Sequence, residues 1–330
     1  MRDTTAGQTK DTREPMDGHR PFRFGVYVGT TPDAWAGQVR RAEELGYDTL
    51  SVGEHIFSDL APISALATAA MLTSTIRIGS LTFANDLHHP VTLAKEVVTL
   101  DALSGGRFEF GFGSGFFRMD YDQTGIPFGP PGVRLDRFFD AVHLIKAAFA
   151  EEHVDHAGQH YTVSGLSLVP KPVQHPHPPL LIGGGGRRVL HFAAREADIV
   201  SINIRSTPAG GFDWASISPE ATARKIAWVR EAAGERFADM ELHALMMRVV
   251  ITEDPETAAR EFIDDFSGFG AANAISVAEV LASPHVLMGS EEEIVETIQR
   301  RRNEYGISYV TVFDDLMERF APIAARLSGS

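Results

Sequence analysis

The 330-residue sequence contains no cysteine. Disulfide bonds, catalytic thiolates and thiolate metal sites are therefore excluded, and cysteine carries no information about the redox compartment. The sequence also lacks any apolar run approaching the roughly 18 residues of a membrane span. Because the first residues do not place a basic segment before an apolar one, we expect no secretory leader and a cytoplasmic location.

Basic residues are scarce, since 30 Lys and Arg stand against 44 Asp and Glu and give a formal net charge of −14. This balance argues against a general nucleic-acid surface and against binding to anionic membranes. We therefore expect a small-molecule partner, with any phosphate site confined to a local pocket. The hydrophobic content of 44% and the charged content of 22% are ordinary for an enzyme with a sizeable core.

What the sequence does contain is a regular alternation of short apolar strands with helices. Residues 1–20 are polar and without periodicity, which predicts a disordered tail, and no linker divides residues 21–330, which predicts one domain. The expected strands lie at residues 22–29, 48–55, 76–85, 107–113, 180–186, 197–203, 241–252 and 308–313. Eight such strands, apolar on both faces and interleaved with helices, favour a (β/α)8 TIM barrel with insertion segments over two domains.

Two stretches interrupt the alternation. Residues 116–134 are rich in glycine and proline, which predicts a long loop. Residues 154–174 predict a short antiparallel excursion. We expect the segments 116–134 and 271–289 to close over a ligand pocket.

The fourth expected strand and its turn, RFEFGFGSG at residues 107–115, anchor the interpretation of the chain. Alternating apolar and small residues run into Gly113, Ser114 and Gly115. In a parallel β/α architecture the loops after the strands gather on one face, so this turn lies where ligands bind. Close approach of a flat ligand would tolerate no side chain at Gly113 or Gly115.

A second glycine-rich turn follows the fifth expected strand. It comprises Gly183, Gly184, Gly185 and Gly186 and continues into Arg187. Backbone N–H groups and the dipole at the start of the next helix favour an anion there, for which a phosphate is the natural occupant. The alternative is a tight strand-to-helix turn with solvated arginines.

Two further strand positions are candidates for chemistry. Glu54 and His55 end the second strand, where an imidazole suits proton donation or polarisation of a carbonyl. The alternatives are a surface or hydrogen-bonded histidine at position 55 and a satisfied strand-end carboxylate at position 54. Gly79, Ser80 and Leu81 interrupt the third strand, which favours either a bulge on which a flat ring rests or small residues for barrel packing. No histidine cluster has carboxylates at ligand spacing, so we expect no metal site.

The segments LDALSGGRFEFGFGSG, HPVTLAKEVVTLD and PPLLIGGGGRRVLHFAAREAD, with the strand ending in Glu54 and His55, resemble the bacterial luciferase-like superfamily of flavin and deazaflavin oxidoreductases. The resemblance runs from about residue 22 to residue 313 and is greatest to the actinobacterial deazaflavin-dependent branch. It implies a barrel whose ring-binding pocket lies at the carboxyl ends of the strands. Homodimers are common in this family, so we expect one here.

The resemblance also implies roles for individual residues. His55 maps to the family histidine at the end of strand two, and a non-prolyl cis peptide behind the ring maps to Ser80 and Leu81. The turn at residues 113–115 maps to the lining of the ring, and residues 183–187 map to the phosphate pocket.

Two places depart from the sugar-phosphate dehydrogenases of the superfamily. Phe116 and Asp59 stand where those proteins have an acidic residue and a tryptophan. A sugar-phosphate substrate is therefore disfavoured, and the apolar pair Phe116 and Phe117 favours a less polar organic substrate.

Three functional hypotheses follow. In the first, the protein moves a hydride between coenzyme F420, an 8-hydroxy-5-deazaflavin, and a C=O, C=N or C=C group of a small organic substrate, with His55 as proton donor or polariser. In the second, it is an FMN-dependent monooxygenase that uses oxygen. In the third, it is a barrel that binds a ligand or partner without turnover.

Overall fold

The computed structural model describes residues 20–29 and 31–330, so the tail predicted over residues 1–20 lies outside the described residues except for its last position. Eight parallel strands pair with one another in chain order. They are β1 (Arg23–Tyr27), β2 (Thr49–Val52), β3 (Arg77–Ser80), β5 (Phe108–Gly113), β8 (Leu180–Gly184), β9 (Ile199–Ile202), β12 (Glu241–Leu245) and β15 (Ile307–Phe313). Because β1 also pairs with β15, and β3 with β5, the sheet closes on itself. The predicted (β/α)8 barrel is confirmed.

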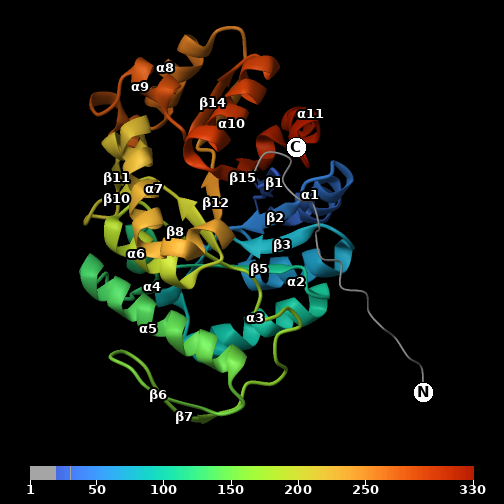
Figure 1. Cartoon of the computed structure of the whole chain (residues 1–330), viewed down its shortest axis with the longest axis vertical. Coiled ribbons are helices and arrows are strands. Elements are labelled where there is room, and N and C mark those ends of the chain that lie inside the picture. The colour runs from blue at the N-terminus through green and yellow to red at the C-terminus, as the bar shows by residue number, and fades with distance from the viewer. Residues whose placement is uncertain (1–19, 30) are drawn as a thin grey trace.

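Helices surround the barrel (Figure 1). The main ones are α1 (Pro32–Glu44), α2 (Pro62–Leu72), α3 (Pro90–Ser104), α5 (Pro131–Ala150), α6 (Arg187–Glu196), α7 (Pro219–Ala233), α10 (Glu291–Tyr305) and α11 (Met317–Leu327). Proline opens five of them, where its missing N–H is not needed for an intrahelical bond. Short 3₁₀ helices lie at η1 (Asn85–Leu87), η2 (Trp214–Ile217), η3 (Gly234–Asp239), η4 (Ser267–Phe269), η5 (Ala271–Asn273) and η6 (Asp314–Leu316).

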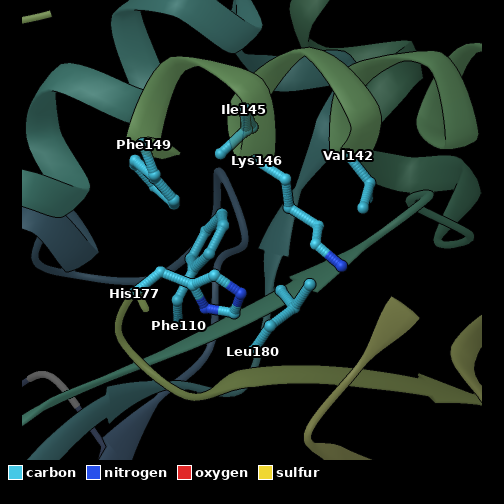
Figure 2. Close-up of a pocket in the computed structure, with 7 residues that line it drawn as sticks. All are labelled: Phe110, Val142, Ile145, Lys146, Phe149, His177 and Leu180. Atoms are coloured by element: carbon cyan, nitrogen blue, oxygen red, sulfur yellow. The ribbon is translucent and has the colours of Figure 1, made fainter. Parts of the chain in front are cut away.

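Strand β5 contributes side chains both to the layer between the barrel and its helices and to the barrel interior, because successive side chains of a strand point to opposite faces. The Phe110 ring contacts the Phe149 ring of α5, with 6.4 Å between their centres. The Phe112 ring contacts the Phe138 ring of the same helix, with 5.0 Å between their centres. Figure 2 shows Phe110 facing α5 in this layer, where the remaining space has no room for a water molecule. The alternate positions of β5 therefore face the barrel interior.

Charged side chains fill the interior at the amino ends of the strands. The Arg23 guanidinium donates to the carboxylates of Glu109 and Glu241, the latter at 2.6 Å. Arg77 also donates to Glu109, at 2.7 Å, and the Arg23 guanidinium lies 4.4 Å from the centre of the Tyr309 ring. Burial alone would raise the pKa of Glu109, but Arg23 and Arg77 outweigh burial and hold this pKa below its ordinary value. We call these five residues the charged seal.

The segment 116–134 is not one long loop, so that prediction is wrong. Helix α4 (Arg118–Thr124) forms inside it, and α5 begins at Pro131, before the end of the expected loop. Gly125 ends α4 in the left-handed conformation at φ 73°, which is a common way for a helix to stop. The glycine that indicated a loop therefore marks the end of a short helix.

The expected single strand over residues 241–252 is also wrong. Only β12 belongs to the barrel, because the chain turns out of the sheet after it. β13 (Arg248–Ile251) instead pairs in parallel with β14 (Val286–Gly289). The sequence did not reveal this break, since the residues on both sides of it are equally apolar.

Two insertions extend from the barrel. One holds β13, β14, α8 (Pro255–Asp265) and α9 (Val277–Ala282), and has a hydrophobic core that also includes Trp214 from the loop after β9. The other is the antiparallel pair β6 (Val154–Ala157) and β7 (Thr162–Leu166), which confirms the predicted excursion. The two insertions lie at opposite ends of the molecule in Figure 1.

No helix in the described part of the chain combines the length and apolar character that crossing a bilayer requires. The domain boundaries at residues 21 and 330 stay a prediction.

Candidate active site at the carboxyl ends of the strands

The carboxyl ends of the barrel strands form an accessible mouth. Tyr27, Leu81, Gly113, Asn203 and Phe313 stand at or just beyond the ends of five strands, and all are half-buried. Below them, the interior is filled by a cluster of Leu181, Ile199 and Tyr309, against which Leu81 packs. Any ligand therefore binds on top of the barrel rather than inside it, as is usual for this architecture.

A hollow of about 270 Å³ opens at this same face beside the ends of β12 and β15. Its lining consists of Met246, Met247, Arg248, Val249, Phe313, Asp314, Asp315 and Leu316. No group of three or more potential metal ligands of the His, Cys, Asp or Glu type is found among the described residues.

His55 lies at this mouth and has a buried carboxylate partner. Its Nδ1 is 2.9 Å from Oδ2 of Asp120, while Oδ1 of the same carboxylate accepts the N–H of Ile56 at 3.0 Å. The His55 ring stacks on Phe57 at 4.8 Å and meets the edge of Phe117 at 5.6 Å. Because a carboxylate only accepts hydrogen bonds, Nδ1 carries a proton in this pair, and Nε2 is the nitrogen available to a ligand.

Asp120 is the functional candidate that the sequence interpretation missed. It lies on α4, within the segment expected to be a loop, and its side chain is 7% exposed. The next residue, Tyr121, donates from its hydroxyl to Asp86 at 3.0 Å, and Asp86 also binds Arg137. The sequence signal for this helix is a seven-residue segment of mixed polar and apolar side chains that is followed by Gly125, because a glycine commonly ends a helix.

Glu54 has both carboxylate oxygens occupied. Oε2 accepts the N–H of Ala84 at 2.7 Å, and Oε1 is 2.8 Å from Nε2 of His88. These contacts fix β4 (Phe83–Ala84) and the turn after it beside the end of β2. The geometry favours the alternative of a satisfied strand-end carboxylate, and the catalytic role of Glu54 stays a prediction.

The break in the third strand lies at Leu81 and Thr82, between β3 and β4. The cis peptide bond joins these two residues, one position beyond the pair Ser80 and Leu81 to which it was mapped. Ser80 is instead occupied within the sheet, since its hydroxyl donates to the carbonyl of Gly111 at 2.8 Å and accepts the N–H of Gly111 at 3.0 Å. Leu81 remains half-buried at the mouth, whereas Ser80 is buried.

The glycines after β5 are required by protein neighbours. A Cβ at Gly113 would lie 2.9 Å from Oγ1 of Thr82, and a Cβ at Gly115 would lie 2.5 Å from the Tyr121 hydroxyl. Gly115 also has a φ of 69°, which other residues rarely adopt. The backbone of this turn is thus held against the break in the third strand, with Ser114 half-buried between the two glycines.

The second glycine turn divides into packed and open positions. A Cβ at Gly183 would lie 2.6 Å from Nδ2 of Asn203, and one at Gly184 would lie 2.4 Å from Cγ1 of Val189. At Gly185 it would lie 2.5 Å from the backbone nitrogen of Arg205. Only Gly186 faces open space within this run.

Gly186 is also the N-cap residue of α6, and within the described part of the chain no side chain accepts the N–H groups of the first turn. Arg187, 57% exposed, pairs loosely with Glu231 at 3.3 Å on the helix surface. An open helix N-terminus with a nearby arginine fits an anionic group such as a phosphate. The tight-turn alternative accounts for Gly183, Gly184 and Gly185. The anion site at Gly186 and Arg187 stays a prediction.

The chain has curated relatives that are named as coenzyme-dependent enzymes. The chain is 28% identical over 196 residues to the F420-dependent glucose-6-phosphate dehydrogenase of Kineococcus radiotolerans, an alignment that covers 56% of this chain and 57% of that protein. It is 27% identical over 187 residues to the FMNH2-dependent dimethylsulfone monooxygenase of Pseudomonas putida, covering 56% and 51%. The chain spans about half the length of these curated relatives.

The fold is shared with a solved structure, the coenzyme F420-dependent tetrahydromethanopterin reductase of Methanopyrus kandleri. The TM-score is 0.76 at 18% identity, and the match covers 94% of this chain and 99% of that one. Residues 18–324 match the family of luciferase-like monooxygenases, so nearly the whole sequence is accounted for by one family. The chain belongs to the luciferase-like monooxygenase family.

Proposed function

We propose that this protein is a deazaflavin-dependent oxidoreductase that moves a hydride between coenzyme F420 and a small organic substrate with a C=O, C=N or C=C group. The observation that carries the proposal is the pair of His55 and Asp120 at the mouth of the barrel. This pair is a proton donor with a fixed orientation, and hydride addition to a polar double bond requires such a donor.

Asp120 orients the imidazole of His55, and its carboxylate balances the positive charge of the ring when both ring nitrogens carry protons. With Nδ1 held by the carboxylate, Nε2 points away from α4, and among the described residues it has no hydrogen-bond partner. When a carbonyl carbon gains a hydride, its oxygen takes the Nε2 proton of a doubly protonated His55 ring, which is left neutral with its remaining proton on Nδ1, and an alcohol results. In the reverse direction Nε2 accepts that proton. A deazaflavin held at this mouth would supply or accept the hydride.

The remaining residues hold the ends of the coenzyme. Leu81, Thr82 and the turn at residues 113–115 meet at the mouth of the barrel, where a flat ring system has access to a half-buried surface. The open N-terminus of α6 at Gly186, with Arg187, would hold a phosphate of the coenzyme side chain.

Titration of the apoprotein separately with coenzyme F420 and with FMN tests this function. We expect F420 to bind, measured by its absorbance and fluorescence, and FMN to bind more weakly. Tight FMN binding with oxygen consumption, and no affinity for F420, would overturn the hydride-transfer proposal in favour of the monooxygenase alternative.

The role of Asp120 as a positioning residue has its own test. Asp120→Asn keeps the size of the side chain but replaces an acceptor with an amide that can donate to Nδ1. We expect turnover to fall by at least about tenfold, with an altered pH profile and unchanged F420 affinity. Asp122→Asn is the matched control, because Asp122 lies on the same helix but pairs with Arg118 in solvent. Equal effects of both variants would contradict the positioning role.

A further inference from the structure

A row of phenylalanine rings crosses the mouth of the barrel, beginning beside His55. Phe57 meets Phe117 with 5.8 Å between ring centres, and Phe117 meets Phe116 at 6.0 Å. Phe116 in turn meets Phe212 of β11 (Phe212–Asp213) at 5.9 Å. We call Phe57, Phe117, Phe116 and Phe212 the aromatic wall. It joins the loops that follow β2, β5 and β9.

The wall leaves apolar surface exposed to solvent. Phe57 is 49% exposed and Phe116 is 37% exposed, and the neighbouring side chains of Ile56 and Met119 are 48% and 39% exposed. Large contiguous apolar patches are uncommon on a soluble protein unless they bind something. Here the patch lies at the catalytic face and touches the proposed proton donor, so its position indicates a ligand of the reaction.

The far end of the wall is anchored. Phe212 contacts Trp214 at 5.7 Å, and Trp214 is 3% exposed within the core of the β13–β14 insertion. The Trp214 Nε1 donates to the carbonyl of Phe269 at 2.8 Å. The insertion therefore supports the wall from behind, and the exposed rings are held in place before a ligand arrives.

The loops after β5 and β9 are also locked to each other. Gly210, in the turn that leads from β10 (Arg205–Ser206) to β11, has a φ of 88°. A Cβ at this position would lie 2.9 Å from Cβ of Arg118 and 3.1 Å from the carbonyl oxygen of Phe116. Since β8 lies between β5 and β9 in the barrel, this contact spans the end of β8.

The charges beside the wall are already paired. Arg118 donates to Asp122 at 2.7 Å, and Arg205 donates to Asp213 at 2.7 Å. A phosphorylated substrate would have to compete with these aspartates for a cation. An uncharged aromatic group needs no such partner, and it gains from offset or edge-to-face contact with the exposed rings.

We propose that the aromatic wall binds an aromatic ring of the substrate and presents the reducible group attached to that ring to Nε2 of His55. Phe116 and Phe212 determine this specificity, because they form the middle and the anchored end of the wall. The presentation of the reducible group rests on the proposed function, but binding of the ring to the wall does not require the coenzyme.

The test measures binding of 2-acetonaphthone, an aromatic ketone, to the full-length apoprotein by calorimetry and by quenching of tryptophan emission. We expect it to bind at least about tenfold more tightly than cyclohexyl methyl ketone, and glucose 6-phosphate not to bind at the wall. Phe116→Ala and Phe212→Ala are each expected to weaken binding of the aromatic ketone by about tenfold.

Two controls keep the outcome decisive. Leu103→Ala removes a side chain that is 49% exposed on the last turn of α3, and it should leave binding unchanged. Phe116→Leu keeps apolar volume without a ring and should lose most of the aromatic preference. Wild-type affinity in Phe116→Leu, or equal binding of all three ligands, would overturn the proposal.

Self-association of the wild type that Phe116→Ala abolishes would also overturn it, because the wall would then be a protein interface. Failure of the function proposed above is distinguishable, since it appears as absent F420 binding while the ketone still binds.

Discussion

The two ends of the same barrel are built from opposite kinds of residue. At the amino ends of the strands, the charged seal closes the interior, and its carboxylates Glu109 and Glu241 are only 4% and 9% exposed. At the carboxyl ends lie half-buried glycines, exposed aromatic rings and His55, whose side chain is 29% exposed. Every charge in the seal has a partner within the barrel, whereas Nε2 of His55 has none among the described residues.

The residues that stabilise the fold and the residues proposed to carry the reaction therefore lie at opposite ends of the barrel. Groups buried with full partners resist change, because removing one member leaves an uncompensated charge. Groups that act on a ligand must keep a polar atom free of protein partners and accessible to solvent, so they contribute less to the stability of the fold. The contrast predicts that substitutions at the amino end affect unfolding, and that those at the mouth affect binding and turnover.

Glu109→Ala should produce the largest effect on stability. It leaves Arg23 and Arg77 without their shared carboxylate, so we expect the free energy of unfolding to fall by about 3–5 kcal/mol. Urea denaturation followed by circular dichroism measures this change. Glu318→Ala, at the exposed pair with Arg41, is the control and should have little effect. Equal stability of both variants would show that the seal does not stabilise the barrel.

His55→Ala should have the converse effect. Turnover with an assigned substrate should fall by roughly a hundredfold or more, because the proton donor is lost. The free energy of unfolding should change by less than about 1 kcal/mol, since the side chain is partly exposed. Single-turnover absorbance of the coenzyme and urea denaturation measure the two quantities. Unchanged turnover would remove His55 from the reaction.

A histidine buried below the mouth should act on stability through pH. His243 bonds to Ser201 and Thr311, and burial lowers its pKa to about 3 from the ordinary 6.5. Between these values the unfolded chain binds a proton that the folded chain does not. Stability should therefore fall on acidification through this window, with His243 contributing about 1.4 kcal/mol per pH unit.

His243→Gln removes this titration and tests its contribution. The slope of unfolding free energy against pH between about 6 and 4 should be shallower in the variant by that amount. An identical slope in wild type and variant would mean that His243 is not held neutral in the folded state. The variant's lower absolute stability does not affect this comparison, because only the slope is read.

The smallest expected effect is that of Gly186→Ala at the second glycine turn. Its φ of −101° suits alanine and its Cβ would meet nothing within 4 Å, so stability should change by less than about 0.5 kcal/mol. Gly185→Ala is the contrast, because its Cβ would overlap the backbone of Arg205 and should destabilise by about 1–3 kcal/mol. Thermal unfolding measures both. Equal losses would show that the open and packed positions do not differ.

Most of the barrel could be predicted because its signals are local. An apolar strand, a glycine stop and a proline start each depend on a few neighbouring residues, so the order of elements followed from the sequence. Helix α4 was not predicted, since it has only seven residues and since Gly125 and the prolines after it dominate the pattern. The division of residues 241–252 into β12 and β13 depends on pairing with β14, which lies far along the chain.

By itself, the sequence determined the barrel class, the glycine turns and the place of His55 at the end of a strand, because these follow from periodicity and backbone freedom. Only the tertiary structure decided which side chains contact one another at the mouth and within the sheet. Asp120 reaches His55 from 65 residues away, Ser80 bonds to Gly111, and Phe212 meets Phe116 across the end of β8. Such contacts depend on which loops meet in space, and that is set by closure of the whole sheet rather than by any local pattern.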